Sequence, residues 1–425
     1  MHHLCSRASR GLLIAAALPL MPLMPLMAGD APIEAVTLSD AVSKGTFGGG
    51  VRYRLDYLDQ DPSTKDALAS TLRLNLAFRT LPFHGFSGYL DLYNNAVVGN
   101  DLYNNIQNAG SSNAQNRPVI VDPAGRGVNE GYGRYTNKAW FDTQITVGRQ
   151  LFTLNDEVFV TASTYRQNNN RFDAASIEAH PLPELLLQYA YIWNNQDVLD
   201  VGKPMASHVG NIKYSKKGIG GMAAYAVLLD FDDSPNRDVS TVGFRIDGPF
   251  KLSDDVSVIY EADVAKQADA FDNSQNIDAN YLMARVGINV KKWYASVGYR
   301  HQSGVSAASD APFEGSQIGY PWPWRGNTEQ LVFTPTQGLN TMMVWVGGAI
   351  PPVSGLSFDL WYFTFNSAEN RVAYGSEYSA ALMYRMPCDP KWWISGMIAQ
   401  ANAGDAGNGT FFDATRAVFM TGYRF

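Results

Sequence analysis

Arginines recur at alternate positions of short apolar stretches, and their chemistry suits anion binding. In residues 51–57, Arg52 and Arg54 alternate with apolar or aromatic side chains. Arginines that share one face attract anions through their summed field, and each planar guanidinium can bind a carboxylate with two parallel hydrogen bonds. The arginines on such polar faces are Arg52, Arg54, Arg73, Arg245, Arg285, Arg300 and Arg385.

Each of these arginines has a second, structural role open to it, because carboxylates occupy comparable positions in other stretches. An arginine paired with an acid on a neighbouring strand holds the two strands together without selecting any solute. Both roles stay open for every one of them. The candidate partners are Asp56, Asp91, Asp142, Glu178, Glu261, Asp263 and Asp359.

A further concentration of charge lies between residues 149 and 171. Its arginines, Arg149, Arg166 and Arg171, could meet the acidic residues Asp156, Glu157 and Asp173. The segment is too long and too mixed in character for a plain surface connection. If it folds back into an enclosed interior it must narrow that interior, so we expect a constriction here.

The stretches that carry the arginines alternate apolar and polar residues with a period of two, which predicts β-strands. Residues 71–78, for example, place four apolar side chains opposite Arg73 and Asn75. Segments of about ten residues with this pattern, separated by turn residues, are typical of membrane barrels. The period alone does not separate a barrel from a soluble sandwich, because both have one polar face.

The connections between the expected strands alternate between short and long, and this favours a transmembrane antiparallel β-barrel with short turns at its periplasmic end. Short turns are expected at 81–84, 180–183, 216–218, 248–250, 291–292, 351–355 and 387–390. Long extracellular loops are expected at 59–66, 94–133, 194–207, 231–237, 266–278, 302–338, 366–373 and 402–413. Threading strands through this pattern gives about 18, or about 16 if the ambiguous residues 134–141 and 157–166 are drawn differently.

The composition agrees with an all-β membrane protein. Charged residues make up 17% of the 425-residue chain, below the roughly 25% of ordinary soluble domains. Beyond residue 28 the apolar runs are short and broken by Gly, Asn or Asp, so any membrane-spanning part must consist of strands. The net charge of −7 argues against nucleic acid as a partner.

The N-terminus has the order of a secretory signal peptide. Arg7 and Arg10 precede an apolar run over residues 11–27, and small residues begin at Ala28. Three prolines interrupt the run, which disfavours a membrane anchor. We therefore expect residues 1–28 to be a cleaved signal peptide.

The remaining chain is expected to be a short periplasmic segment, 29–45, followed by the barrel, 46–425. Only Cys388 would remain after cleavage, so the mature chain would form no intrachain disulfide. A closed barrel suits such an exported chain, because every backbone donor and acceptor pairs with a neighbouring strand.

The chain ends on Phe425, and apolar or aromatic residues fall at alternate positions before it, including Tyr423 and Phe419. This pattern looks like the terminal-strand signal that the outer-membrane barrel assembly machinery reads. We expect Tyr423 and Phe425 to carry that signal.

Several short motifs resemble the alginate-export-like porin family of Gram-negative outer membranes. The motifs are Arg52-Tyr-Arg54, Ser70-Thr-Leu-Arg73, Val147-Gly-Arg-Gln150, Asn155-Asp-Glu-Val-Phe159, Tyr165-Arg-Gln-Asn168, Phe172-Asp-Ala174, Thr334-Pro-Thr-Gln-Gly-Leu339 and Tyr374-Gly-Ser-Glu377. The resemblance implies a monomeric pore with periplasmic termini and a lumen lined by arginine and acidic residues. This sequence departs from the strongly cationic alginate exporter, because its acidic residues outnumber the basic ones by 40 to 33.

These observations predict an outer-membrane porin for passive diffusion of small hydrophilic solutes, favouring anionic or carboxylate-bearing ones. The alternatives are a channel for export or uptake of an acidic polysaccharide such as alginate, a plugged structural or adhesive barrel, and an outer-membrane hydrolase. The expected pore-lining residues are Arg52, Arg54, Arg73, Arg149, Arg166, Arg171, Arg245, Arg285, Arg300, Arg385, Glu261 and Asp263.

Aromatic residues near the expected strand ends favour interfacial girdles over a sugar-stacking track. They include Tyr53, Tyr57, Trp193, Tyr225, Trp293, Tyr299, Trp361, Trp392, Trp393 and Tyr423. The expected partners are outer-membrane lipid and lipopolysaccharide, the barrel assembly machinery, and small-molecule or oligosaccharide solutes.

Catalysis has little support in the sequence. The mature histidines, His84, His180, His208 and His301, are scattered, and the chain has no nucleophile elbow, zinc-protease motif or phosphate-binding loop. We therefore expect neither an enzyme nor a cofactor or metal.

Overall fold

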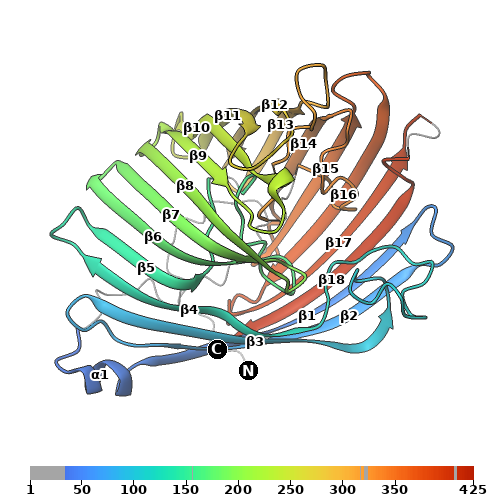
Figure 1. The fold of residues 1–425 in the computed structure, drawn as a ribbon. Helices are drawn as coiled ribbons and strands as arrows, with labels where there is room; N and C mark the ends of the chain where they lie inside the picture. Colours follow the sequence, from blue (N-terminus) through green and yellow to red (C-terminus); the bar gives the residue numbers. More distant parts are fainter. Residues whose placement is uncertain (1–33, 156, 316, 320–323, 406–408) are drawn as a thin grey trace.

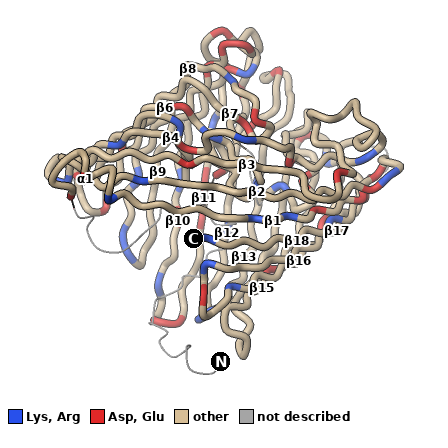
Figure 2. The backbone as a smooth tube through the Cα atoms, turned by 90° about the horizontal axis from the view of Figure 1, so that it is seen from below, with Lys and Arg blue, Asp and Glu red and all other residues tan. Residues whose placement is uncertain are grey.

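The computed structural model describes residues 34–425 except positions 156, 316, 320–323 and 406–408. These residues form one closed antiparallel sheet of 18 strands (Figure 1). Strand β1 (Thr46–Gln60) pairs with β2 (Ala67–Arg79) on one side and with β18 (Ala414–Arg424) on the other, and the three lie side by side in Figure 2. The predicted all-β barrel is thus confirmed, with the larger of the two expected strand numbers.

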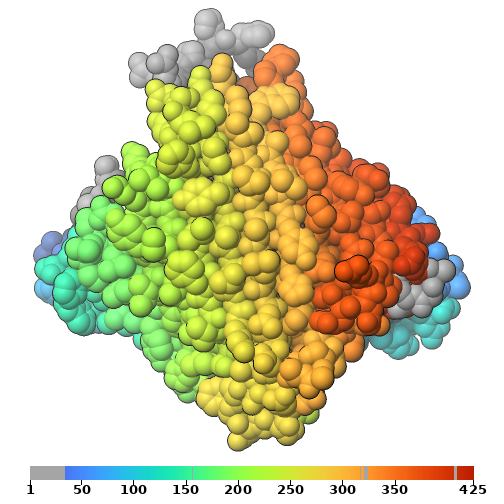
Figure 3. Space-filling model, turned by 90° about the horizontal axis from the view of Figure 1, so that it is seen from above, coloured from blue at the N-terminus to red at the C-terminus, as the bar shows by residue number. Residues whose placement is uncertain are grey.

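The other strands follow one another around the barrel in chain order, as the succession of colours across the wall shows in Figure 3. They are β3 (Phe86–Leu102), β4 (Gly125–Asn137), β5 (Thr143–Gln150), β6 (Arg171–Leu182), β7 (Leu185–Gln196), β8 (Gly202–Lys216), β9 (Gly220–Leu229), β10 (Val239–Lys251), β11 (Val256–Asp269), β12 (Asp278–Val290), β13 (Trp293–Gln302), β14 (Leu339–Ala349), β15 (Leu356–Asn366), β16 (Ala373–Arg385) and β17 (Trp392–Ala403).

The period-two pattern sorts the side chains between the outside and the inside of the barrel. On β2, the outward-facing Leu74 and Leu76 are 40% and 53% exposed, whereas the inward-facing Arg73 and Asn75 are almost completely buried. The apolar face therefore points away from the barrel, where it can contact hydrocarbon, and the polar face points into the interior.

Connections at one end of the barrel are short, and those at the other end are mostly long. The short-turn end carries the turns at 183–184, 217–219 and 291–292, and the long-loop end carries loops such as 103–124 and 303–338. The predicted loop 94–133 was too long, because β3 continues to Leu102 and β4 already begins at Gly125.

The two ambiguous segments take different structures. Strand β4 ends at Asn137 and a turn over residues 138–142 leads to β5. Residues 157–166 contain no long strand and belong instead to a loop, 151–170, between β5 and β6. Eighteen strands result because residues 134–137 complete β4, and the loop adds none.

The segment before β1 lies against one turn at the short-turn end of the barrel. Thr37 is the N-cap of helix α1 (Leu38–Ser43), because its hydroxyl accepts a hydrogen bond from the backbone N–H of Asp40. The helix lies beside the β2–β3 turn. The Leu81 N–H donates to the Ala41 carbonyl at 2.9 Å. None of the helices in the described part of the chain is long and apolar enough to span a membrane. The expected signal peptide, 1–28, lies outside the described residues.

Candidate functional site

Loop 151–170 lies inside the barrel. Its polar side chains are buried although the loop sits at the long-loop end, and they contact inward-facing residues of β1 and β2. Between 0% and 2% of each side chain is exposed at Arg166, Gln167, Asn168, Asn169, Asn170 and, at the start of β6, Arg171. A surface loop would leave such groups in water, so the sequence-based prediction of an inward fold between 149 and 171 agrees with the structure.

Arginines of the first two strands hold this loop in place. Arg52 donates to the Gln167 side chain and to the Thr164 carbonyl, both at 2.9 Å. Arg73 donates to the Gln167 carbonyl and to the Asn169 side chain. The guanidinium groups thus satisfy loop carbonyls that the strands do not reach, which fixes the loop against one wall of the barrel.

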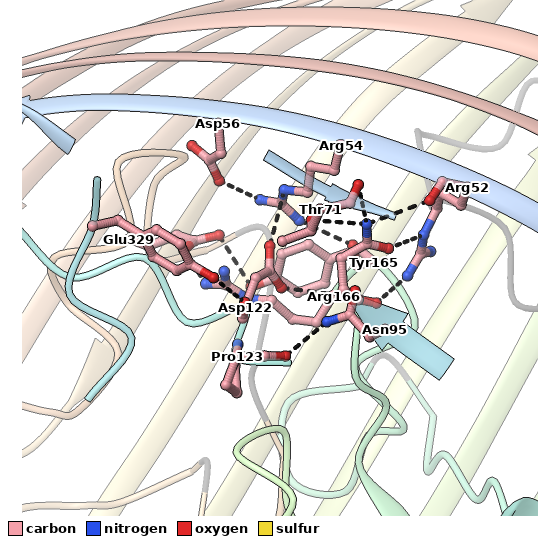
Figure 4. A network of polar contacts seen from close by, with 12 residues as sticks. Arg52, Arg54, Asp56, Thr71, Asn95, Asp122, Pro123, Tyr165, Arg166 and Glu329 are labelled. Atoms are coloured by element: carbon pink, nitrogen blue, oxygen red, sulfur yellow. Dashed lines mark hydrogen bonds and ion pairs between the residues drawn. The ribbon is translucent and has the colours of Figure 1, made fainter. Parts of the chain in front are cut away.

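A cluster of six charged side chains joins this loop to two strands and two other loops, and Figure 4 draws most of it. We call it the neutral cluster, because it contains three arginines and three carboxylates. Its members are Arg54, Asp56, Asp122, Arg166, Glu329 and Arg416. Five of them are at most 3% exposed, and Glu329 is 12% exposed.

The ion pairs within the neutral cluster are continuous. Arg54 contacts Asp56 at 2.7 Å and Asp122 at 3.2 Å. Arg416 contacts Asp56 at 2.7 Å and Glu329 at 2.8 Å. Arg166 forms an ion pair with Glu329. Since buried charges are costly unless they are paired, this matching stabilises the loops within the barrel.

Glu329 belongs to a second inward loop, 303–338, between β13 and β14. Its environment has two opposing effects on ionisation. Burial alone would raise the pKa of Glu329, but the nearby guanidinium groups of Arg166 and Arg416 hold that pKa below its usual value. The carboxylate is therefore charged at neutral pH.

A separate charge network lines the wall formed by β10, β11 and β12. Arg285 donates to both carboxylate oxygens of Glu261, at 3.0 Å for the longer hydrogen bond. Arg245 lies 3.1 Å from Asp247 and 3.6 Å from both Glu261 and Asp263. Four of the predicted residues, Arg245, Arg285, Glu261 and Asp263, are thus brought together, and there the paired, structural arrangement prevails.

The remaining predicted arginines are dispersed. Arg149 pairs with Asp173 at 2.7 Å, and Arg171 pairs with Asp200 at 2.6 Å. Arg300 is buried, donates to the Trp324 carbonyl at 3.2 Å and lies over that indole ring. Asp156, which was expected to join the constriction, lies outside the described residues. Arg385 belongs to neither network.

Arg385 lines a cavity of about 90 Å³ at the short-turn end, which we call the basic cavity. Its walls include cationic side chains from β1, β2, β16, the β16–β17 turn and β18. They are Arg52, Arg73, Arg385, Lys391 and Arg424. No carboxylate occurs among its described lining residues, so positive charge is concentrated there without an internal counterion.

Two further cavities follow toward the long-loop end. The middle cavity, about 80 Å³, is lined by Thr164, which also lines the basic cavity, and by Glu329. The outer vestibule, about 910 Å³, again includes Glu329 and opens among the long loops. Each cavity thus shares a lining residue with the next one along the barrel.

The aromatic prediction is correct at some positions and wrong at two. Trp293 and Trp392 are both 46% exposed, as expected of residues at a membrane interface. Tyr225 and Trp361 are both 3% exposed. Tyr225 donates to Asp263 at 2.6 Å, because it falls on the inward face of β9, together with the buried Ala223 and Val227.

Sequence reasoning missed Arg416, Arg424, Asp122 and Glu329. The alternation of the terminal strand could have found the first two, since Arg416 and Arg424 lie on the face opposite Phe419 and Tyr423. Asp122 and Glu329 lie in loops, where no period signals the direction of a side chain.

The histidines remain apart from one another. His208 contacts the Tyr189 hydroxyl and His301 contacts Asn340, in both cases through Nδ1. Within the described residues, no group of three or more His, Cys, Asp or Glu side chains is arranged to hold a metal ion.

Comparisons with known proteins find relatives in structure but not in sequence. No protein-family model matches the chain, and no curated protein matches it. Among solved structures, OccAB3 of Acinetobacter baumannii is 13% identical with a TM-score of 0.69, and the match covers 90% of this chain and 100% of that one. OpdO of Pseudomonas aeruginosa is 14% identical with a TM-score of 0.68, covering 91% and 98%.

A third structure, OpdK of Pseudomonas aeruginosa with vanillate, is 11% identical with a TM-score of 0.64, covering 89% of this chain and 98% of that one. At these identities the likeness shows a shared fold. The chain thus shares the fold of these barrels over nearly its whole described length.

Proposed function

We propose that this protein is an outer-membrane porin through which small hydrophilic solutes diffuse, with a preference for anionic, carboxylate-bearing ones. The supporting observation is the basic cavity. Five cationic side chains line it and no carboxylate occurs among its described lining residues, so its field favours anions. The 18 strands of the described chain supply a wall wide enough to enclose a channel.

The size of the inner cavities favours small solutes. Loops 151–170 and 303–338 occupy much of the interior, and the middle and basic cavities measure only about 80 and 90 Å³. A guanidinium pair or triad at such a narrow point can bind one carboxylate at a time. Vanillate, the aromatic carboxylate found with OpdK, is a suitable first solute to test.

Transport of an acidic polysaccharide is the second candidate, and the motifs similar to alginate-export-like porins support it. The basic cavity would also attract uronate carboxylates. Uronate oligomers that block the channel current at low concentration would favour this candidate, whereas block by monomeric carboxylates alone would favour small solutes.

The location and assembly partners are part of the same proposal. The outward apolar side chains, such as Leu74 and Leu76, would contact outer-membrane lipid and lipopolysaccharide. Phe425 would be read by the barrel assembly machinery. No catalytic step is proposed.

Planar-bilayer recordings test the proposed selectivity. In a gradient of KCl, the reversal potential of the purified full-length protein should have the sign of an anion-selective pore. A cation-selective reversal potential would overturn the anion preference, and the absence of any stable conductance would favour a plugged structural barrel.

A further inference from the structure

Glu329 occupies the boundary between the outer vestibule and the middle cavity. The residue lines both. A solute that moves directly from the vestibule into the middle cavity therefore meets this residue.

The contacts of Glu329 are those that a carboxylate-bearing solute would make. It forms ion pairs with Arg166 and with Arg416, the latter at 2.8 Å, and it accepts a hydrogen bond from the Tyr165 hydroxyl at 3.2 Å. Two guanidinium groups and a phenol form a built recognition site for one carboxylate. In this structure the carboxylate that fills it belongs to the protein.

Charge balance ties the position of Glu329 to the presence of another anion. With Glu329 in place, the neutral cluster has three cations and three anions. If its side chain swings away, Arg166 loses its ion pair with Glu329, and Arg416 loses one of the two carboxylates that it contacts. Taking a carboxylate away from buried arginines is unfavourable, so displacement is favoured when another carboxylate, which accepts the same hydrogen bonds, takes its place.

The receiving arginine stays in position when Glu329 leaves. Arg416 is held by two hydrogen bonds to Asp56, at 2.9 and 2.7 Å, and donates to the Asn327 carbonyl at 3.0 Å. The binding geometry for an incoming carboxylate is thus already formed on the barrel wall.

The backbone on both sides of Glu329 is anchored independently of its side chain. Glu377 accepts the backbone N–H groups of Asn327 and Thr328 at 2.6 and 3.0 Å. Gln330 exchanges two hydrogen bonds with the backbone of Phe412, at 3.0 and 2.8 Å. The side chain can therefore move while the loop remains in the barrel.

The backbone of Glu329 is itself in an unfavourable conformation. Its φ of 62° lies in the left-handed region, which residues other than glycine rarely adopt. Such a conformation persists only where surrounding contacts impose it. The contacts on either side of Glu329 and those of its carboxylate provide that constraint.

From these observations we propose that the Glu329 side chain occupies the site of a solute carboxylate and keeps the channel closed, a role that we call the latch. An anionic solute replaces Glu329 on Arg166 and Arg416, and this exchange opens the path from the vestibule to the middle cavity. This inference rests on the proposed anion-conducting function. It adds a solute-operated gate and names the residues that form it.

The wild-type protein provides the first test. Single channels in KCl are recorded while benzoate or its uncharged analogue benzamide is added on the long-loop side. Benzoate should raise the open probability by roughly fivefold or more, which is the lower end of ordinary coupling between ligand binding and conformation, and benzamide should have no effect. An equal response to both compounds, or no response to benzoate, overturns the proposal.

Variants provide the second test. Glu329→Gln should open in KCl without any carboxylate, and added benzoate should no longer raise its open probability. Glu369→Gln is the matched control, because it removes the same charge from an exposed position on the β15–β16 loop. If Glu329→Gln retains the benzoate response of the wild type, the latch is wrong.

The two proposals fail in distinguishable ways. If the wild type has a cation-selective reversal potential, the anion-porin function is wrong. If the wild type is anion-selective but benzoate does not change its gating, only the latch is wrong. If Glu329→Gln does not fold, as judged by loss of the heat-modifiable electrophoretic form, the comparison of benzoate with benzamide on the wild type still decides whether the latch is correct.

Discussion

Asp56 on β1 and Arg416 on β18 form a bidentate ion pair, with hydrogen bonds of 2.9 and 2.7 Å, between the first and last strands of the barrel. The two residues are 360 positions apart in the chain, and both are at most 1% exposed. The pair therefore lies where the sheet closes, and it also positions the arginine that contacts Glu329.

Loss of this pair should destabilise the barrel. Asp56→Asn leaves Arg54 and Arg416 with one carboxylate fewer, and breaking a buried ion pair typically costs about 3–5 kcal/mol. The free energy of unfolding, measured by urea titration of the protein in lipid vesicles, should fall by about this amount.

Asp278→Asn is the control for that experiment. It breaks the exposed Lys266–Asp278 pair, in which the side chains are 63% and 45% exposed. An exposed pair contributes roughly 0–1 kcal/mol. Similar losses in the two variants would contradict a special role for the Asp56–Arg416 pair.

Arg385 should contribute to anion selectivity through the basic cavity. Arg385→Gln removes one of five cations there, and a unit charge acting at about 4 Å through water changes an ion's energy by about 1 kcal/mol. The chloride-to-potassium permeability ratio from reversal potentials should fall by roughly twofold to fivefold. Lys292→Gln, on an exposed turn, should leave the ratio unchanged, and an equal effect of both variants would argue against the cavity.

The latch should be insensitive to pH in the neutral range. The pKa of Glu329 is held below its ordinary value of 4.5, so the carboxylate stays charged as the pH falls from 8 to 5. Its ion pairs are lost only when the pH falls further, through the lowered pKa. Single-channel gating should therefore change only under acid conditions, and Glu329→Gln should lack that change.

A gating transition near pH 7 would contradict this assignment. Other charged or titratable groups around Glu329 include Arg54, Asp56, Asp122, Tyr165, Arg166 and Arg416, and Glu157 lines the same middle cavity. Comparison with Glu329→Gln separates the contribution of Glu329 from those of its neighbours.

The side chain of Phe425 should matter for assembly rather than for the final stability of the sheet. Its backbone exchanges two hydrogen bonds of 3.0 Å with Gly49, and these do not depend on the ring. Phe425→Ala should lower the yield of heat-modifiable barrel in the outer membrane several-fold. Phe86→Ala, which removes another exposed phenylalanine at the same end of the barrel, should assemble normally.

Strand alternation predicted the direction in which several arginine side chains point. Arg52, Arg54 and Arg73 were placed inward because an unpaired charge facing lipid is costly, and the structure has them there. The same rule would have found Arg416. The separate prediction of interfacial aromatic girdles was wrong for Tyr225 and Trp361, because aromatic type alone does not tell which face of a strand a residue occupies.

The sequence by itself determined the all-β barrel, its strand directions and the inward set of arginines, because a period of two and the cost of burying charge act locally along each strand. Only the tertiary structure decided which partners those arginines meet. Arg416, Asp56 and Glu329 are far apart in the chain. Their contacts depend on closure of the sheet and on loops that fold into the barrel. Local sequence patterns carry no information on either, since both depend on contacts between residues that are far apart in the chain.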